Sequence, residues 1–235
     1  MPNPFFAFKQ FTIYHDRCAM KVGTDGVLLG AWTDVSSSKN VLDIGTGTGL
    51  ISLMIAQRND ASSIVAIDID DAAVSQAKEN VSASPWKERI AVINQDICLY
   101  QPSMRFDTIV SNPPFFIDSL KCPDGQRNTA RHTDTLPIQS LLRKGGELLS
   151  NDGAFSIIIP YDQSEEIIRL AEGEGLYLVR HTQVVTRPGL PPKRSLLTFW
   201  KTKEECKNDE LTIELDRHVY TDEYIALTKD FYLKM

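Results

Sequence analysis

The sequence has no long apolar run, because no stretch approaches the roughly 18 uninterrupted apolar residues of a membrane-spanning helix. Its first residues, Met1-Pro2-Asn3-Pro4, also lack the positively charged region of a secretory signal. No membrane partner is therefore expected. The sequence predicts a cytoplasmic protein.

Cysteine and histidine are scarce, with four residues of each type. They are widely separated, and none shows the spacing of a zinc or redox motif. We therefore expect no metal site and interpret the cysteines as reduced structural thiols. The residues are Cys18, Cys98, Cys122, Cys206, His15, His132, His181 and His218.

An excess of positive charge is also missing, since the formal net charge is −6. That balance disfavours binding to nucleic acid through bulk charge, which requires clustered lysine and arginine. The charge is unevenly distributed, however. Residues 183–201 hold four basic side chains and no acidic one, whereas residues 202–235 hold nine acidic and five basic ones. This asymmetry predicts one local basic face.

What is present is the pattern of one large α/β domain, because 235 residues with 42% hydrophobic content can bury a continuous core. No repeat or linker divides the chain. We expect a single domain over residues 1–235. It would comprise an amino-terminal extension of a strand and a helix (1–38), a Rossmann-like core (39–201) and a carboxyl-terminal extension (202–235).

Short β-branched runs alternate with helical patterns from residue 40 onward, which predicts βαβαβ order and a doubly wound, mostly parallel α/β sheet. A final hairpin would give this seven-stranded sheet an antiparallel edge strand. The expected strands are 41–44, 64–67, 90–93, 108–110, 154–159, 177–186 and 195–201. The expected helices are 49–58, 71–82, 137–149 and 165–174.

Both extensions carry their own signals. Residues 9–14 alternate like a strand, and Thr24 or Asp25 is a plausible N-cap for an apolar helix through Trp32. Residues 221–224 resemble a second helix start near the end of the sequence.

A glycine-rich turn follows the first core strand: Asp43-Ile44-Gly45-Thr46-Gly47-Thr48-Gly49. Glycine lets a backbone adopt positive φ angles and approach a ligand closely. The spacing is D-x-G-x-G-x-G rather than the G-x-G-x-x-G typical of pyrophosphate-containing dinucleotides. It favours S-adenosylmethionine, whose ammonium could be held through or near Asp43.

The ribose of that cofactor would need a carboxylate, and we expect Asp68 to supply it. The next residue, Ile69, would also contact the cofactor. Asp68 ends the second strand, 19 residues after Gly49, where an acidic side chain can accept both ribose hydroxyls. Asp70 competes for this role. A purely structural alternative is that Asp68 caps the helix beginning at Asp71.

Asp96 and Ile97 follow the third strand. There, an acidic side chain could accept the adenine amino hydrogen of the cofactor while Ile97 packs on the ring. An ordinary Asx-turn over Asn94-Gln95-Asp96 explains the same residues equally well.

The segment Asn112-Pro113-Pro114-Phe115 directly follows the fourth strand and would open beside the glycine loop. The Asn112 side-chain oxygen and the Pro113 carbonyl could accept both hydrogens of a planar amine and expose its lone pair to a methyl donor. Proline rigidity would hold these acceptors still, and Phe115 could stack on the planar group. The alternative is a rigid turn with a core phenylalanine.

These elements resemble the bacterial valine-tRNA adenine-N6 methyltransferases, within the class I enzymes that use S-adenosylmethionine. The similarity extends over nearly the whole chain. It is carried by Phe11–Ile13, Met20–Trp32, Ser111–Phe116, Ala130–His132, Lys193-Arg194 and Asp230–Leu233.

The resemblance implies methylation of the adenine immediately 3′ of the anticodon. It places Lys21, Gly23, Thr24 and Asp25 near the cofactor, puts Asn112 to Phe115 around the target base, and lets Lys193 and Arg194 touch RNA. Many relatives have tyrosine at the position of Phe115, and phenylalanine there also occurs in guanine-N2 methyltransferases of ribosomal RNA.

The leading hypothesis is therefore a tRNA adenine-N6 methyltransferase that binds a base turned out of its stack, as a monomer or weak homodimer. The alternatives are a guanine-N2 ribosomal RNA methyltransferase, a protein-glutamine N5 methyltransferase, or a binding module without activity. Basic side chains favour RNA, and they are Arg127, Arg131, Arg187, Lys193 and Arg194.

Overall fold

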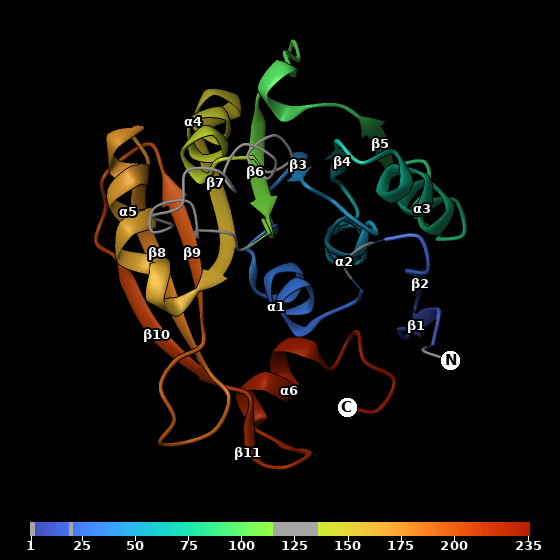
Figure 1. Ribbon diagram of the computed structural model, residues 1–235, viewed down its shortest axis with the longest axis vertical. Coiled ribbons are helices and arrows are strands. Elements are labelled where there is room, and N and C mark those ends of the chain that lie inside the picture. Colours follow the sequence, from blue (N-terminus) through green and yellow to red (C-terminus); the bar gives the residue numbers. More distant parts are fainter. Residues whose placement is uncertain (1–2, 19–20, 115–135) are drawn as a thin grey trace, which may run out of the picture.

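The computed structural model describes residues 3–18, 21–114 and 136–235. Its centre is an eight-stranded sheet in which neighbouring strands are hydrogen-bonded (Figure 1). In spatial order these strands are β10 (Lys207–Thr212), β8 (Tyr177–Val185), β9 (Arg194–Trp200), β7 (Leu149–Pro160), β6 (Phe106–Ser111), β3 (Asn40–Ile44), β4 (Ser63–Asp68) and β5 (Ile90–Asn94).

The predicted class, a doubly wound α/β sheet, is confirmed, but two details of the prediction are wrong. The sheet has eight strands rather than seven, because β10 adds to its edge in parallel with β8. The antiparallel strand β9 lies inside the sheet, between β7 and β8. Its apolar residues Leu196, Leu197 and Phe199 are fully buried, as expected of a strand covered on both faces.

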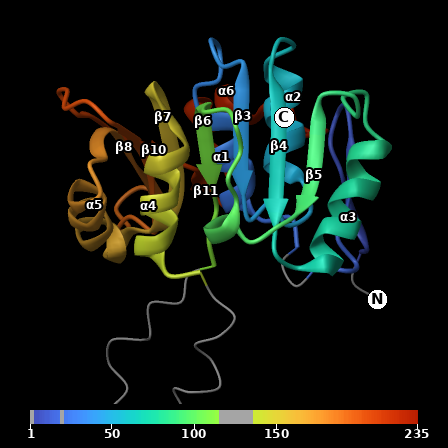
Figure 2. The same cartoon turned by 90° about the horizontal axis from the view of Figure 1, so that it is seen from above.

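Helices cover both faces of the sheet. Figures 1 and 2 show α1, α2 and α6 together on one side, with α4 on the opposite side and α3 beside the β5 edge. The helices are α1 (Thr24–Trp32), α2 (Leu50–Arg58), α3 (Asp71–Ser82), α4 (Ile138–Leu148), α5 (Ser164–Gly173) and α6 (Asp222–Thr228). Two short 3₁₀ turns are η1 (Ile97–Leu99) and η2 (Tyr161–Gln163).

Two apolar clusters form the core, one on each face of the sheet. Val41 and Val110 belong to the cluster that contains α1 and α2, whereas Leu42 and Ile109 belong to the cluster with α4 and α5. Successive strand residues point to opposite faces, so continuous apolar runs such as the one in β3 contribute to both.

The two extensions pack against each other. The small hairpin of β1 (Phe5–Ala7) and β2 (Thr12–Tyr14) precedes α1, and a second hairpin of β11 (Glu214–Asp216) and β12 (Val219–Tyr220) precedes α6. Phe8 forms an isolated β-bridge with Tyr232, and their rings stack with centroids 5.9 Å apart. The expected division into residues 1–38, 39–201 and 202–235 stays a prediction. β10 belongs to the expected carboxyl-terminal extension and nevertheless forms an edge strand of the central sheet.

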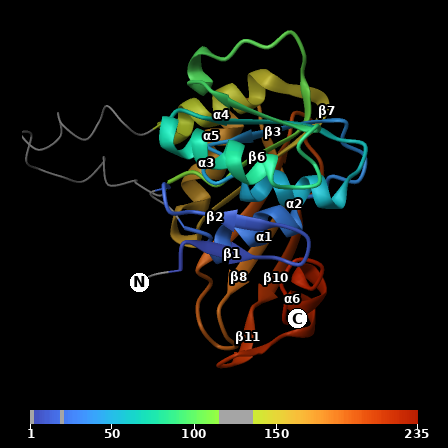
Figure 3. The same cartoon turned by 90° about the vertical axis from the view of Figure 1, so that its right-hand side faces the viewer.

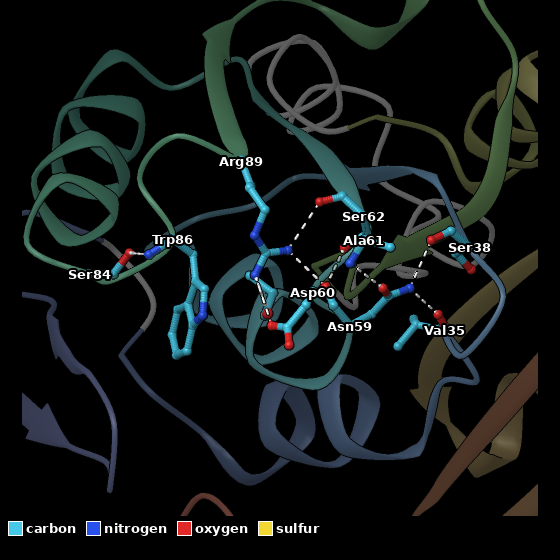
Figure 4. A network of polar contacts seen from close by, with 10 residues as sticks. Val35, Ser38, Asn59, Asp60, Ala61, Ser62, Ser84, Trp86 and Arg89 are labelled. Atoms are coloured by element: carbon cyan, nitrogen blue, oxygen red, sulfur yellow. Dashed lines mark hydrogen bonds and ion pairs between the residues drawn. The ribbon is translucent and has the colours of Figure 1, made fainter.

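Arginines stabilise the carboxyl-terminal ends of two helices at the edge of the sheet opposite the glycine loop. Arg89 donates to the carbonyls of Ala56, Asn59 and Ser62 at 2.6–3.1 Å, around the end of α2 (Figure 4). Arg58 donates in the same way to Gly30 and Thr33, at the end of α1. Helix ends leave such carbonyls without intrahelical partners, and a cation there also complements the helix dipole.

Replacing Arg89 with Lys should lower the free energy of unfolding by about 1–3 kcal/mol, because one ammonium cannot reach three carbonyls. Urea denaturation measures this loss. The matched control is Asp60→Asn. Its carboxylate is almost fully exposed and lies 3.8 Å from Arg89, so its removal should leave the unfolding curve unchanged. An Arg89→Lys protein as stable as the wild type would contradict the capping role.

Candidate active site

The candidate site lies at the carboxyl ends of the parallel strands β3, β4, β5 and β6. In doubly wound sheets, ligands bind at this edge. The glycine loop follows β3, Asp68 ends β4 and Asn112 follows β6. The structure therefore brings these three predicted elements to one edge of the sheet.

The glycine loop adopts backbone conformations that favour glycine. Gly45, Gly47 and Gly49 have φ angles of 71°, 56° and 82°. A Cβ atom added to Gly45 or Gly47 would meet no described atom within 4 Å. Backbone N–H groups of Gly45 and Thr46 donate to the carbonyl of Ile67 at 2.8 and 3.0 Å. The loop is thus anchored to β4 while one side of it stays open.

Asp43 is fully buried beneath this loop. Its Oδ2 accepts hydrogen bonds from the hydroxyls of Thr46 and Ser52, both at 2.7 Å, whereas Oδ1 has no partner among the described residues. Burial and, to a smaller extent, the charge of Asp68 raise the pKa of Asp43 from 3.8 to about 6, against the opposing effect of the two hydroxyl bonds. The free Oδ1 can accept a hydrogen bond from a ligand or water.

Asp68 and Asp70 have different roles. Asp70 is the N-cap of α3, and its side chain accepts from the N–H of Ala72 at 2.8 Å. Asp68 accepts the N–H of Gly47 at Oδ2 and that of Asp70 at Oδ1. Asp68 therefore faces the glycine loop, as the ribose-binding hypothesis requires, and the adjoining Ile69 side chain is exposed.

Asp96 makes an Asx-turn, but over residues 96–98 rather than over the expected Asn94-Gln95-Asp96. Its Oδ1 accepts the N–H of Cys98 at 2.8 Å and caps η1. Ile97 is buried in the core cluster beside α4. One carboxylate oxygen of Asp96 thus already accepts a hydrogen bond within the turn. A cofactor-binding role for Asp96 and Ile97 stays a prediction.

Asn112 lies between β6 and the first turn of α1. The hydroxyl of the preceding Ser111 donates to the Ile44 carbonyl at 2.8 Å, which ties the ends of β6 and β3 together. The Asn112 Oδ1 is buried and accepts no hydrogen bond from a described residue. Gly26 of α1 packs nearby, because a Cβ there would lie 4.0 Å from Asn112 Nδ2. Pro113 and Pro114 follow, and Phe115 lies outside the described residues.

The start of α1 differs from the prediction. Gly23, rather than Thr24 or Asp25, is the N-cap, and no side chain caps the helix. Asp25 instead binds the Nε of Arg194 at 2.8 Å. This ion pair fixes the start of α1 to the start of β9. The Asp25 carboxylate is therefore not available to cap the helix. Lys21 is exposed immediately before this turn.

Two of the five predicted RNA-binding side chains form ion pairs within the described part of the protein. Arg187 forms an ion pair with Glu214 at 3.4 Å, and Arg194 binds Asp25. Lys193 is exposed. Arg127 and Arg131 lie outside the described residues.

Sequence reasoning missed two buried amides of α3, Gln76 and Asn80, which are 0% and 1% exposed. Asn80 donates to the carbonyl of Thr48 in the glycine loop. Ala73, Ala77 and Val81 recur at helical spacing and form a buried apolar face of α3. Gln76 and Asn80 follow Ala73 and Ala77 by three residues, a spacing that could have marked them as inward-facing.

The expected absence of a metal and of a membrane partner stays a prediction. No helix in the described part of the chain has the length and apolar character needed to cross a bilayer, and no cluster of three metal-binding side chains occurs there. A cavity of about 540 Å³ lies near Asp107, Thr108 and Asp152, towards the opposite ends of the strands. None of the predicted site residues lines it, so we place the candidate site at the glycine loop.

A doubly wound sheet with a glycine loop between strand and helix, followed by an acidic residue on the next strand, is typical of nucleotide-binding folds, and solved methyltransferases share this architecture. A solved O-methyltransferase from Agrobacterium tumefaciens, itself a predicted one, matches 88% of this chain and 96% of its own, with TM-score 0.69 and 19% identity. A TehB-like SAM-dependent methyltransferase from Corynebacterium glutamicum matches 77% and 89%, with TM-score 0.51 and 19% identity. At such identities the likeness shows the fold alone.

Sequence comparison is more specific. The methyltransferase small domain family model matches residues 22–172. Proteins named tRNA1(Val) (adenine(37)-N6)-methyltransferase from Phocaeicola vulgatus and Klebsiella pneumoniae are 61% and 45% identical over the whole of this chain and 100% and 97% of their own. The chain therefore belongs to the methyltransferase small domain family and, within it, to the group of these full-length relatives.

Asp43→Asn should flatten the pH dependence of stability. The folded protein holds the Asp43 proton more tightly than the unfolded chain does, because the pKa rises from 3.8 to about 6. This stabilising contribution is complete below about pH 4 and is lost as the pH rises through about 6.

Urea denaturation between pH 4 and 7 tests this expectation. Relative to Asp43→Asn, the wild type should lose up to roughly 3 kcal/mol of unfolding free energy across that range, at about 1.4 kcal/mol for each unit of pKa shift. Parallel curves for the two proteins would show that the buried carboxyl does not titrate in this range.

Proposed function

We propose that this protein transfers a methyl group from S-adenosylmethionine to the N6 amino group of an adenine in tRNA, the adenine 3′ of the anticodon of a valine tRNA. The observation that carries the proposal is the buried Asn112 Oδ1, a hydrogen-bond acceptor without a described donor, at the end of the strand that pairs with β3, from which the glycine loop begins. The names of relatives 45–61% identical over the full chain support this choice of substrate.

The residues present fit the cofactor. The open side of Gly45 and Gly47 admits a ligand close to the backbone, and the buried Asp43 Oδ1 can accept a hydrogen bond from its ammonium, directly or through water. Each carboxylate oxygen of Asp68 holds one backbone N–H and keeps a second lone pair for a ribose hydroxyl. When bound, the cofactor supplies an electrophilic methyl group on a sulfonium.

Asn112 and Pro113 would prepare the adenine amine. Its lone pair is delocalised into the ring, which makes the nitrogen a weak nucleophile. Two acceptors, Asn112 Oδ1 and the Pro113 carbonyl, would bind both N–H groups, favour tetrahedral nitrogen and expose the lone pair. Displacement at a sulfonium methyl needs alignment more than a strong base. The amine nitrogen would take the methyl group, the sulfonium would leave as a neutral thioether, and the amine would release one proton to solvent water.

The start of β9 would receive the RNA. Arg194, on β9, binds Asp25, which lies on the first turn of α1. The residue after Asp25, Gly26, packs near Asn112. The Arg194 guanidinium is thus held close to the proposed base pocket, and the exposed Lys193 precedes Arg194 in the chain. Phosphate contacts of this kind position a nucleic acid without reading its sequence. We expect such an enzyme to act in the cytoplasm as a monomer or weak homodimer.

Purified protein should label tRNA when incubated with radiolabelled S-adenosylmethionine and total tRNA from a strain lacking the gene. Nucleoside mass spectrometry should then identify N6-methyladenosine, mapped to the anticodon loop of valine tRNA. Ribosomal RNA and ribosomal proteins serve as competing substrates. Label in N2-methylguanosine or methylglutamine, with none in tRNA, would replace the proposal with one of those activities.

Asn112→Ala should reduce methyl transfer about a hundredfold or more, the scale seen when one preorganised hydrogen-bonding group is removed. Cofactor affinity, measured by calorimetry, should change little because Asn112 acts on the target amine. Asn208→Ala, an exposed position on β10, is the control. A fully active Asn112→Ala enzyme would refute the amine-binding role.

A further inference from the structure

Helix α3 buries two primary amides on the side that faces the amino-terminal hairpin. Gln76 and Asn80 are one turn apart and almost completely inaccessible to solvent. Figures 1 and 3 show β2 running alongside this helix. Burying an amide costs free energy unless it is hydrogen-bonded, so the partners of these two side chains indicate what they do.

Asn80 connects two segments that are distant in sequence. Its Oδ1 accepts the N–H of Tyr14, and its Nδ2 donates to the carbonyls of Tyr14 and Thr48, each at 2.9 Å. The amide pairs with Tyr14 much as a neighbouring strand would, while its second N–H holds the glycine loop. Both amide hydrogens are therefore used.

The glycine loop also packs closely on α3 at this point. A Cβ atom on Gly49 would lie 3.5 Å from the Cβ of Ala77, one turn before Asn80. Thr48 lies between Gly47, whose N–H binds Asp68, and Gly49, the N-cap of α2. A change at Asn80 thus acts on the loop that would carry the cofactor.

Helix α3 also binds the residues that follow β2. Gln76 Oε1 accepts the N–H of Arg17 at 3.2 Å, and the Arg17 guanidinium forms an ion pair with Glu79 at 2.7 Å. Burial, followed by the charges of Asp68 and Asp70, raises the pKa of the neighbouring Cys18 thiol to about 11. Residues 14–18 therefore run from Asn80 to the vicinity of Asp68.

We propose that Asn80 is a positioning residue that couples docking of residues 14–18 to the conformation of the glycine loop, so that this segment forms one wall of the cofactor site. The inference rests on the proposed binding of S-adenosylmethionine at the loop. A ligand that favours the ordered loop then favours the docked segment, and the docked segment strengthens ligand binding by the same factor.

The chain offers a closely matched control in Asn59. It is also buried, its Nδ2 donates to the carbonyls of Val35 and Ser38, and its Oδ1 accepts the N–H of Ala61 (Figure 4). Asn59 lies beyond the end of α2, away from the glycine loop. Asn59→Ala and Asn80→Ala thus remove the same number and kind of hydrogen bonds from different ends of the molecule.

Both variants should lose thermal stability to a similar extent, but only Asn80→Ala should weaken binding of S-adenosylmethionine, by about tenfold within the usual range of coupling between sites. Calorimetry measures the affinity. In the wild type and in Asn59→Ala, the cofactor should slow trypsin cleavage after the exposed Arg17. In Asn80→Ala, this protection should disappear.

Equal cofactor affinities in the two variants, or an unprotected Arg17 in wild-type protein that binds the cofactor, would overturn the coupling alone. A wild-type protein that does not bind the cofactor would overturn the proposed function. If Asn80→Ala does not fold, Gln76→Ala provides the same two measurements. It removes only the Arg17 contact, and we expect several-fold weaker binding. Unchanged binding and protection in Gln76→Ala would count against the coupling.

Discussion

The architecture of the site depends on one buried carboxylate. Asp43 is on strand β3, and its Oδ2 binds a hydroxyl from the glycine loop and another from helix α2. These two bonds join strand, turn and helix into one unit at the edge where the other site residues meet. Burying such a group unpaired would be costly, so its hydroxyl partners, Thr46 and Ser52, matter as much as the glycines. The glycine conformations permit the turn, and the carboxylate holds it in place.

Local patterns predicted most of the fold because most of its elements are determined locally. Helix α3 begins and ends at the predicted residues, and the first four core strands lie where β-branched runs indicated. The position of β9 inside the sheet depends instead on which strands pair over long distances, and local alternation does not encode that. β10 was missed because only Leu211 of its six residues is buried, so its sequence gives no apolar signal.

The position of the candidate residues could be predicted where a residue directly follows or ends a predicted strand, as with the glycines, Asp68 and Asn112, which meet at one edge of the sheet. Sequence alone could not separate Asp68 from Asp70, because the choice depends on which side chain caps α3 and which faces Gly47. Nor could it show that Arg194 is paired with Asp25 across 169 positions of the chain. Assignments of cofactor and RNA contacts to individual residues remain predictions.

The contact between the two extensions bears on the order of folding. Lys9 donates to the carbonyl of Lys229, 220 positions away, near the stacked pair of Phe8 and Tyr232. Closing so long a loop costs chain entropy before any contact compensates for it. We therefore expect the contacts of Phe8 and Lys9 to form late, because their partners near the carboxyl terminus are synthesised last. The amino-terminal hairpin can meet α3 earlier, through Asn80, and is held on its second side only when the final helix has been made.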